Sequence, residues 1–208
     1  MVLTLMRQIK LWYACWLCLL LAGPVAAETR WQLVKEGHGI RIYTAVSGPR
    51  DFKSIKAVAV FEGTLEKFIT VVLDIENQPN WVYGTRRSAI LKKVSNREIL
   101  YYVETDLPWP ASNRDAVIRT RVKENQADNL LSVTAVGEPR AYPTQDKLVR
   151  VPHFSATWQV RTVGKNKLSL TYLLDVNPGG SLPPWIVNLF VTKGPYESFR
   201  KLSGLLKN

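Results

Sequence analysis

Alternation of apolar and polar side chains is the dominant pattern over most of the chain. Residues 154–161 alternate without interruption, residues 168–176 place apolar side chains at every second position, and residues 116–123 put apolar and basic side chains on opposite faces. Period two with one apolar face is typical of half-buried antiparallel strands. Further strands are expected at 40–46, 53–61, 88–94, 98–105 and 130–136. The pattern therefore predicts a sheet of about eight strands.

Two segments show helical spacing instead. Apolar residues between 65 and 73 recur three and four positions apart, with Thr64 as the expected N-cap and Pro79 as the expected end of the helix. A short helix is also expected over residues 29–35.

The last helix begins at Pro183-Pro184 and extends nearly to Asn208. Its apolar stripe is expected to include Trp185, Leu189, Thr192, Tyr196, Phe199, Leu202 and Leu206. Gly194-Pro195 interrupts the stripe and is expected to bend or break the helix. These elements predict one α+β domain, a mainly antiparallel sheet that curves around a long C-terminal helix. Periodicity leaves open whether a solid core or a cavity lies between them.

The first residues have the character of a secretory leader. Arg7 and Lys10 precede a run of apolar residues at 11–22, and small side chains follow at Val25 and Ala27. We expect a signal peptide at 1–27 and a single domain at 28–208. Both cysteines, Cys15 and Cys18, fall within this leader. The mature protein is therefore expected to fold without disulfides in the periplasm or, alternatively, to be secreted.

Composition narrows the functional classes. The chain has 208 residues and 46% hydrophobic residues, which is ordinary for a globular protein. Its only histidines are His38 and His153, so we expect no metal site and no cofactor. No nucleophile elbow, phosphate-binding loop or dinucleotide motif is present, which disfavours an enzyme.

The net charge of +11 suggests an anionic partner. Its cations are scattered over outward strand positions, unlike the gathered platform of a nucleic-acid module, so no nucleic-acid partner is expected. Transient contact with an anionic membrane surface fits this charge, and an ordinary soluble basic surface is the alternative.

A series of landmarks follows in order along the chain. The first helix is followed by Asp74 and Pro79-Asn80-Trp81, then by Tyr101-Tyr102, Trp109-Pro110, Asn113-Arg114-Asp115-Ala116-Val117 and Gly180-Ser181-Leu182-Pro183-Pro184-Trp185-Ile186-Val187-Asn188. In this order and spacing they resemble a START domain, of the lipid-transfer family related to the steroidogenic acute regulatory protein. The resemblance covers about residues 30–206.

This resemblance implies a helix-grip fold in which a curved antiparallel sheet encloses an apolar tunnel beneath the C-terminal helix. It implies that a monomer binds one lipid, phospholipid or sterol-like, and carries or presents it between membranes, with the last helix as a lid. We expect lipid-binding residues at Trp81, Tyr101, Val103, Ile118, Thr120, Trp158, Tyr172, Val187, Asn188 and Phe190. Trp109 and Trp185 are expected to dock at the membrane.

One departure from the family pattern concerns the ligand. Sterol-type members can carry an acid–arginine pair inside the tunnel. The arginine position here is Thr120 and the acid position falls on Tyr101, which weakens the case for a sterol.

Two other functions remain open. One is an enzyme of the wider helix-grip superfamily, such as a polyketide cyclase/aromatase, that uses Arg114, Asp115 or Tyr101 as acid or base. The other is a lipid sensor that transfers nothing. A structural role for Arg114 and Asp115, holding the loop after Trp109-Pro110, is the simpler interpretation.

Overall fold

The computed structural model describes residues 29–46 and 53–207. The predicted signal peptide at 1–27 lies outside these described residues.

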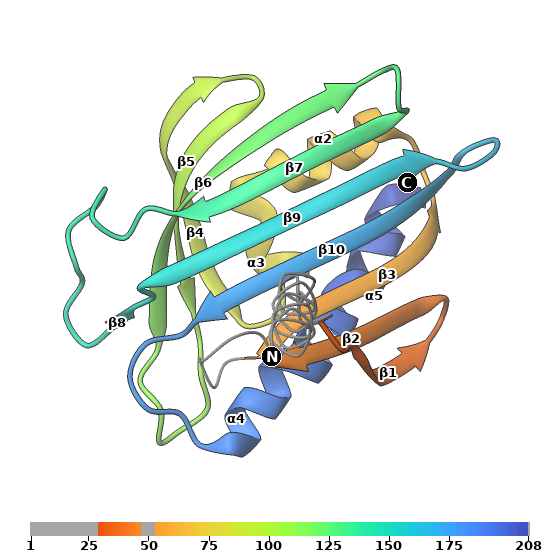
Figure 1. Cartoon of the computed structure of the whole chain (residues 1–208). Coiled ribbons are helices and arrows are strands. Elements are labelled where there is room, and N and C mark those ends of the chain that lie inside the picture. The colour runs from red at the N-terminus through yellow and green to blue at the C-terminus, as the bar shows by residue number, and fades with distance from the viewer. Residues whose placement is uncertain (1–28, 47–52, 208) are drawn as a thin grey trace, which may run out of the picture.

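One curved sheet makes up most of the fold (Figure 1). Its strands lie in the order β1-β2-β3-β10-β9-β7-β6-β5-β4, each antiparallel to its neighbours, and the short β8 pairs in parallel with the start of β6. The strands are β1 Gln32–Gly37, β2 Ile40–Val46, β3 Lys53–Glu62, β4 Thr85–Ser95, β5 Glu98–Thr105, β6 Arg114–Asn125, β7 Leu130–Gly137, β8 Val149–Arg150, β9 His153–Thr162 and β10 Lys167–Asn177.

The eight strands predicted from alternation are confirmed, with ends that move by a few residues. The helix expected at residues 29–35 is wrong, because this segment contributes to β1, which pairs with β2 along the sheet edge. Its register slips between Leu33 and Lys35, and this irregularity hides the strand pattern. The two-residue β8 was not predicted, since it is too short to show a period.

The first predicted helix is confirmed as α2, Leu65–Leu73, and the Thr64 side chain accepts a hydrogen bond from the Lys67 amide at 3.2 Å. It ends at Asp74 and not at Pro79. A 3-10 turn, Ile75–Asn77, leads into a short helix, α3, Gln78–Trp81. Pro79 lies in the first turn of α3, where its missing N–H costs nothing.

The C-terminal helix has three parts. They are α4 Pro184–Asn188, a π-helical turn Leu189–Lys193, and α5 Gly194–Lys207. The Gly194 amide donates to the Leu189 carbonyl five residues earlier, and Pro195 has no N–H to continue an α-helical pattern. The predicted interruption at Gly194-Pro195 is therefore confirmed.

The π-turn also corrects the predicted apolar stripe. Its wider turn shifts the inward positions, so the buried residues are Ile186 and Val191, five positions apart, and then Tyr196. Trp185 lies outside the stripe and is exposed.

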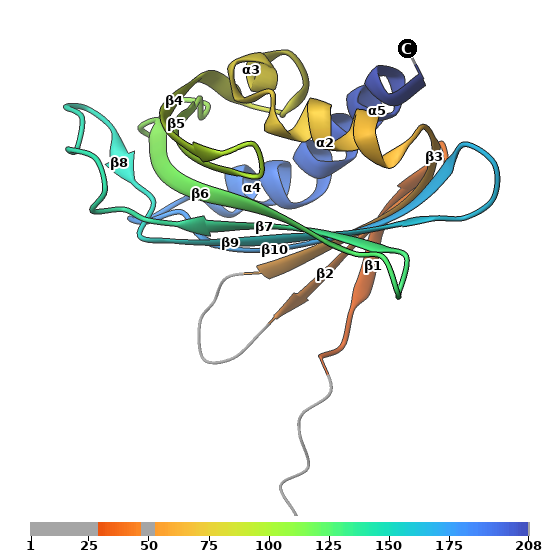
Figure 2. The ribbon, with the colours of Figure 1, turned by 90° about the horizontal axis from the view of Figure 1, so that it is seen from above.

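The helices all lie on the concave face of the sheet (Figure 2). Phe199, Leu202 and Leu206 of α5 are buried in the main core together with strand residues such as Ile42 and Leu170. This arrangement is the helix-grip fold that the resemblance to START domains implied. Between the sheet and the helices the packing is incomplete, and the space that remains is the candidate site.

Candidate functional site

A cavity of about 320 Å³ lies between the inner face of the sheet and the C-terminal helix. Inward side chains of β5, β6, β7, β9 and β10 form one wall, and residues of α3, α4, the π-turn and α5 form the other. The wall is mostly aliphatic and aromatic. An apolar hollow with few polar groups is the usual character of a small-molecule site.

Aromatic rings build one end of this wall. Trp158 stacks on Phe199 with ring centroids 5.2 Å apart and lies 4.3 Å from Tyr172. Phe68 of α2 meets the Trp158 ring edge-on at 5.5 Å. These contacts tie β9 and β10 to α2 and α5, so this end of the cavity is rigidly framed.

Uncharged polar groups interrupt the apolar wall beside Tyr101. The Tyr101 pKa is raised because its hydroxyl is fully buried, while hydrogen bonds from Gln78 and Thr120 act in the opposite direction. Burial likewise raises the pKa of Tyr172, and the nearby Tyr101 adds to this effect. Both phenols are therefore neutral at physiological pH. The positions where sterol-type members can carry an ion pair hold a neutral hydrogen-bonding cluster here.

The indole N–H of Trp81 is a further polar group of the wall. Trp81 is buried at the cavity, and its Nε1 atom has no hydrogen-bond partner among the residues that the structure describes. A buried donor without a partner costs about 1–3 kcal/mol, so a ligand acceptor at this position would be stabilising.

Arg114 is the only charged side chain that lines the cavity within the described part of the chain. It begins β6 on the inner face, two positions before Ala116. Its guanidinium donates to the carbonyls of Ser112, Pro178 and Gly179, the last at 3.0 Å. Arg114 thus connects the β5–β6 loop to the segment that leads into α4.

Asp115 points to the opposite face of β6. Arg150 pairs with it through two hydrogen bonds, Nε to Oδ1 at 2.9 Å and Nη2 to Oδ2 at 2.8 Å. These contacts agree with a structural role for Arg114 and Asp115 in holding the loop after Trp109-Pro110. An acid–base role for Asp115 does not agree with its position outside the cavity.

The structure places nine of the ten predicted lipid-binding side chains along the cavity: Trp81, Tyr101, Val103, Ile118, Thr120, Trp158, Tyr172, Val187 and Phe190. Asn188 is the exception. It is exposed and absent from the lining, because the residues of α4 that face inward are Ile186 and Val187. Its prediction as a head-group contact is therefore corrected.

Several lining residues were not predicted. Arg114 and Ala116 share the inward parity of Ile118 and Thr120, so strand alternation alone could have identified them. Gln78 and Ser198 could not be found in this way, because they lie in helices that the tertiary fold brings over the sheet.

The other carboxylates of this region lie away from the cavity lining. Glu104 is within salt-bridge distance of Arg86 and Arg87, and Asp106 accepts a hydrogen bond from Asn113 at 2.7 Å. Among residues 29–46 and 53–207 no group of three or more His, Cys, Asp or Glu side chains could hold a metal ion.

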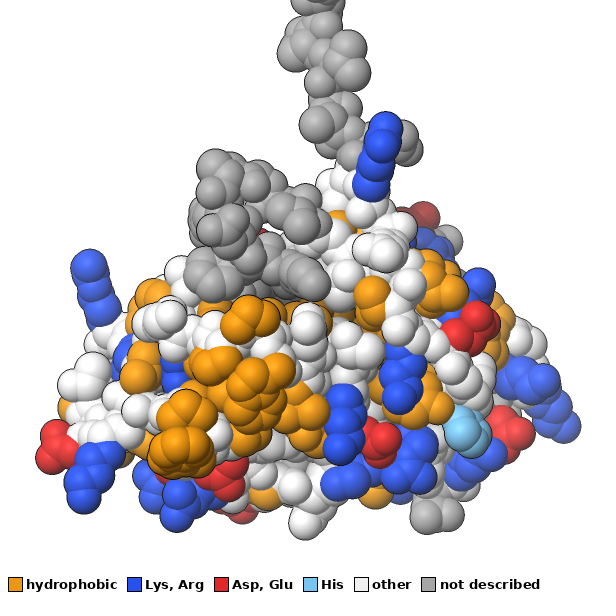
Figure 3. Space-filling view, turned by 90° about the horizontal axis from the view of Figure 1, so that it is seen from below, with side chains coloured by type: hydrophobic (Ala, Val, Ile, Leu, Met, Phe, Trp, Pro, Cys, Tyr) orange, Lys and Arg blue, Asp and Glu red, His pale blue; other side chains and the backbone are white. Residues whose placement is uncertain are grey.

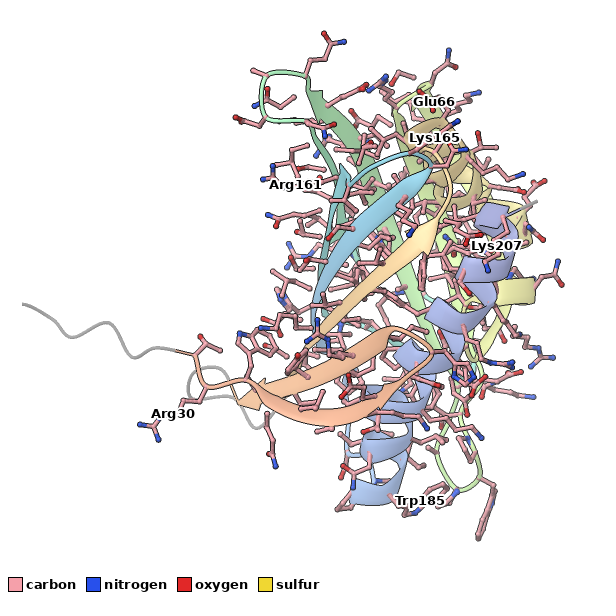
Figure 4. The ribbon with its side chains drawn as sticks, turned by 90° about the vertical axis from the view of Figure 1, so that its right-hand side faces the viewer. Arg30, Glu66, Arg161, Lys165, Trp185 and Lys207 are labelled. Carbon is pink, nitrogen blue, oxygen red and sulfur yellow. The ribbon has the colours of Figure 1, made fainter. Side chains whose placement is uncertain are left out.

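Two tryptophans are exposed at the α4 end of the molecule. Trp109, in the β5–β6 loop, is 89% exposed, and Trp185, in α4, is 51% exposed. Figure 4 shows Trp185 at this end, pointing away from the fold. Figure 3 views the molecule from this end and shows hydrophobic side chains gathered there, with Lys and Arg side chains around them. None of the helices that the structure describes is long and apolar enough to cross a bilayer.

Comparison with known proteins agrees with this geometry. Residues 12–208 match the family model of the START domain. The chain is 26% identical to an uncharacterised protein of Pseudomonas aeruginosa, over 87% of this chain and 88% of that protein. It is 25% identical to the phosphatidylcholine transfer protein of Mus musculus, over 85% of this chain and 84% of that protein.

Solved structures share the fold. A STAR-related lipid transfer protein from Xanthomonas axonopodis superposes with a TM-score of 0.77 at 24% identity, over 86% of this chain and 99% of the other. Human STARD10 superposes with a TM-score of 0.73 at 22% identity, over 88% of this chain and 75% of the other. The cavity between sheet and helix, the curved antiparallel sheet and the match of residues 12–208 lead to one conclusion: this chain belongs to the START domain family.

Proposed function

We propose that this protein binds one lipid in the cavity beneath its C-terminal helix and carries it between membranes without changing it chemically. The observation that carries this proposal is the largely apolar cavity between the curved sheet and the helix. The name of the mouse relative, a phosphatidylcholine transfer protein, supports the same class of function.

The free energy of binding would come from the acyl chain or ring system. Each methylene removed from water contributes about 0.8 kcal/mol, so a chain of ordinary length supplies enough to hold the ligand. Selection among lipids would come from shape and from the few polar groups of the wall: the Tyr101–Gln78–Thr120 cluster, the Trp81 N–H and Arg114.

Movement of the C-terminal helix would open the cavity. The π-turn and Gly194-Pro195 interrupt its regular hydrogen bonding where the helix lines the cavity. Ser198 connects α5 to the segment before β4, because its Oγ accepts from the Tyr83 amide at 2.9 Å and donates to the Gly194 carbonyl at 2.9 Å. Breaking this connection would free the helix to move.

Docking would place the α4 end on the membrane. Trp109 and Trp185 are amphipathic rings suited to the interface between water and lipid, and the positive net charge favours an anionic surface. We propose that the protein acts as a monomer in the periplasm or outside the cell, after removal of residues 1–27. N-terminal sequencing of the protein from a cell fractionation would test this location.

Native mass spectrometry of the purified protein tests the binding proposal. We expect a complex with one lipid, and transfer of a fluorescent lipid between two liposome populations. A protein that purifies empty and takes up no lipid from liposomes would refute the proposed function. A protein that binds a lipid but never delivers it would instead be a sensor.

A further inference from the structure

Arg114 is a charged group in a place where charge is costly. Its residue is 5% exposed, and it lies on the wall of a cavity otherwise lined by apolar and neutral polar side chains. An arginine stays protonated in proteins, and burial of a charge without an opposite charge is strongly unfavourable.

Its surroundings do not neutralise it. The acceptors of its hydrogen bonds are three backbone carbonyls, and no carboxylate of the described residues lies within salt-bridge distance. Burial alone lowers the pKa of Arg114, and no acidic neighbour raises it again. The other largely buried arginines differ: Arg150 pairs with Asp115, and Arg119 pairs with Glu98 and Glu138.

The guanidinium also keeps hydrogen-bonding capacity. Of its five N–H groups, one on Nε, one on Nη1 and one on Nη2 reach the carbonyls. The remaining two, one on each terminal nitrogen, have no partner among the residues described. A phosphate or a carboxylate is the group that a guanidinium fork recognises best.

The position of Arg114 fits a head group. Arg114 holds the loop that carries Trp109 and the segment that leads into α4, so it lies toward the end of the cavity where the exposed tryptophans are. A lipid that enters tail first from a membrane at this end would leave its polar group beside Arg114.

We propose that the ligand carries an anionic oxygen group, a phosphate or a carboxylate, and that Arg114 is the residue that contacts it. This inference rests on the proposed function and adds the charge of the ligand. The cavity volume of about 320 Å³ lies at the low end of the roughly 300–1,000 Å³ usual for ligand pockets, so single-chain amphiphiles are suitable probes.

Three probes of equal chain length separate the contribution of ligand charge to affinity from that of apolar burial. They are hexadecyl phosphate, hexadecanoate and hexadecanol, and each competes with a fluorescent apolar ligand for binding to the purified protein. We expect the wild-type protein to bind the two anions on the order of 10- to 100-fold more tightly than the alcohol, the range of a charged hydrogen bond. Inorganic phosphate alone is expected to displace nothing, because the anion must be attached to the chain.

Arg114→Met removes the charge, and Arg114→Lys keeps it. We expect Arg114→Met to bring the anion-to-alcohol affinity ratio to about one and Arg114→Lys to keep part of the preference. This ratio is informative even if the loop is loosened, since a structural defect weakens the binding of all three probes together. Thermal melting of both variants checks that they are folded.

Equal affinity of the wild-type protein for hexadecanol and the anions would overturn the inference and leave the proposed lipid binding intact. An anion preference retained in Arg114→Met, or displacement by inorganic phosphate alone, would also overturn it. Failure of all three probes to bind would refute the proposed function together with the inference.

Discussion

Asp115 and Arg150 form a bidentate ion pair beneath the loop that joins β7 to β8, with nitrogen–oxygen distances of 2.9 and 2.8 Å. Asp115 is 1% exposed. Arg150 also donates to the carbonyls of Pro139, Tyr142 and Pro143 in this loop, and its hydrogen bonds to Asp115 raise its pKa. The pair therefore fixes the loop against the outer face of β6, behind the cavity wall.

Asp115→Asn is expected to lower the free energy of unfolding by about 3–5 kcal/mol, because it leaves the charge of Arg150 buried without its partner. Denaturant titration measures this change. Asp175→Asn is the control: Asp175 is an exposed carboxylate on β10, and its loss is expected to cost less than about 1 kcal/mol. Similar losses for both variants would contradict the interpretation of the Asp115–Arg150 pair as a structural support.

Ala135 and Val136 are neighbours on β7 that face opposite sides of the sheet. Ala135 lines the cavity, whereas Val136 is exposed. Ala135→Phe is expected to fill part of the cavity and weaken lipid binding by about tenfold or more, with a change in unfolding free energy under about 1 kcal/mol, since the ring enters empty space.

Val136→Phe is the matched control and is expected to bind lipid like the wild-type protein. Uptake of a fluorescent lipid, with melting curves for both variants, measures the difference. Equal uptake by the two variants would mean that the ligand lies outside the cavity.

The exposed Trp109 and Trp185 are expected to carry the contact with membranes. Replacing either one with Ala is expected to weaken association with anionic liposomes by roughly tenfold, because each ring loses its burial in the interface, while binding of a soluble lipid probe is unchanged. Liposome co-sedimentation measures the association.

Trp31→Ala is a control for general loss of aromatic surface, since Trp31 follows Arg30, which Figure 4 shows far from Trp185. An equal loss of liposome association in this variant would argue against docking through the α4 end.

Ser198 is expected to hold the C-terminal helix closed. Ser198→Ala leaves the Tyr83 amide without its acceptor, and we expect a loss of about 1 kcal/mol in unfolding free energy. If the same contact breaks when the cavity opens, lipid exchange between liposomes is expected to become roughly fivefold faster.

Ser203→Ala is the control on the same helix, because the Ser203 hydroxyl donates a hydrogen bond to the Arg200 carbonyl of its own helix and reaches no other element among the described residues. Stopped-flow transfer measures both rates. Unchanged exchange in Ser198→Ala would show that opening does not require this contact to break.

Much of the architecture follows from local pattern. Alternation located the strands from β2 onward apart from β8, and helical spacing with Thr64 located α2. These predictions succeeded because the inner face of most strands meets apolar side chains and the outer face meets water, although β5 is buried on both faces. The pattern failed where pairing is irregular, as in β1, and where the π-turn shifts the inward face from Trp185 to Ile186.

The sequence likewise predicted part of the site and missed the rest. The parity of β5, β6, β9 and β10 was sufficient to place Tyr101, Ile118, Trp158 and Tyr172 on one face. Strand parity predicts the face toward which a side chain points but not how close two side chains lie. It therefore could not show that Gln78 and Thr120 meet the Tyr101 hydroxyl. Asn188, which lies in a helix, was predicted to face the cavity but is exposed on the other side of α4 from the cavity lining.

By itself the sequence determined which side chains of the regular strands turn inward, since on a strand this direction alternates with every position. Tertiary structure alone decided which inward side chains meet: Trp158 of β9 stacks on Phe199 of α5 with ring centroids 5.2 Å apart, although the two residues lie in different elements of the chain. It also decided that the space under the helix stays partly empty and that Arg114 enters it without a carboxylate. The reason is physical, because packing and charge compensation depend on separations in space, which a one-dimensional pattern does not contain.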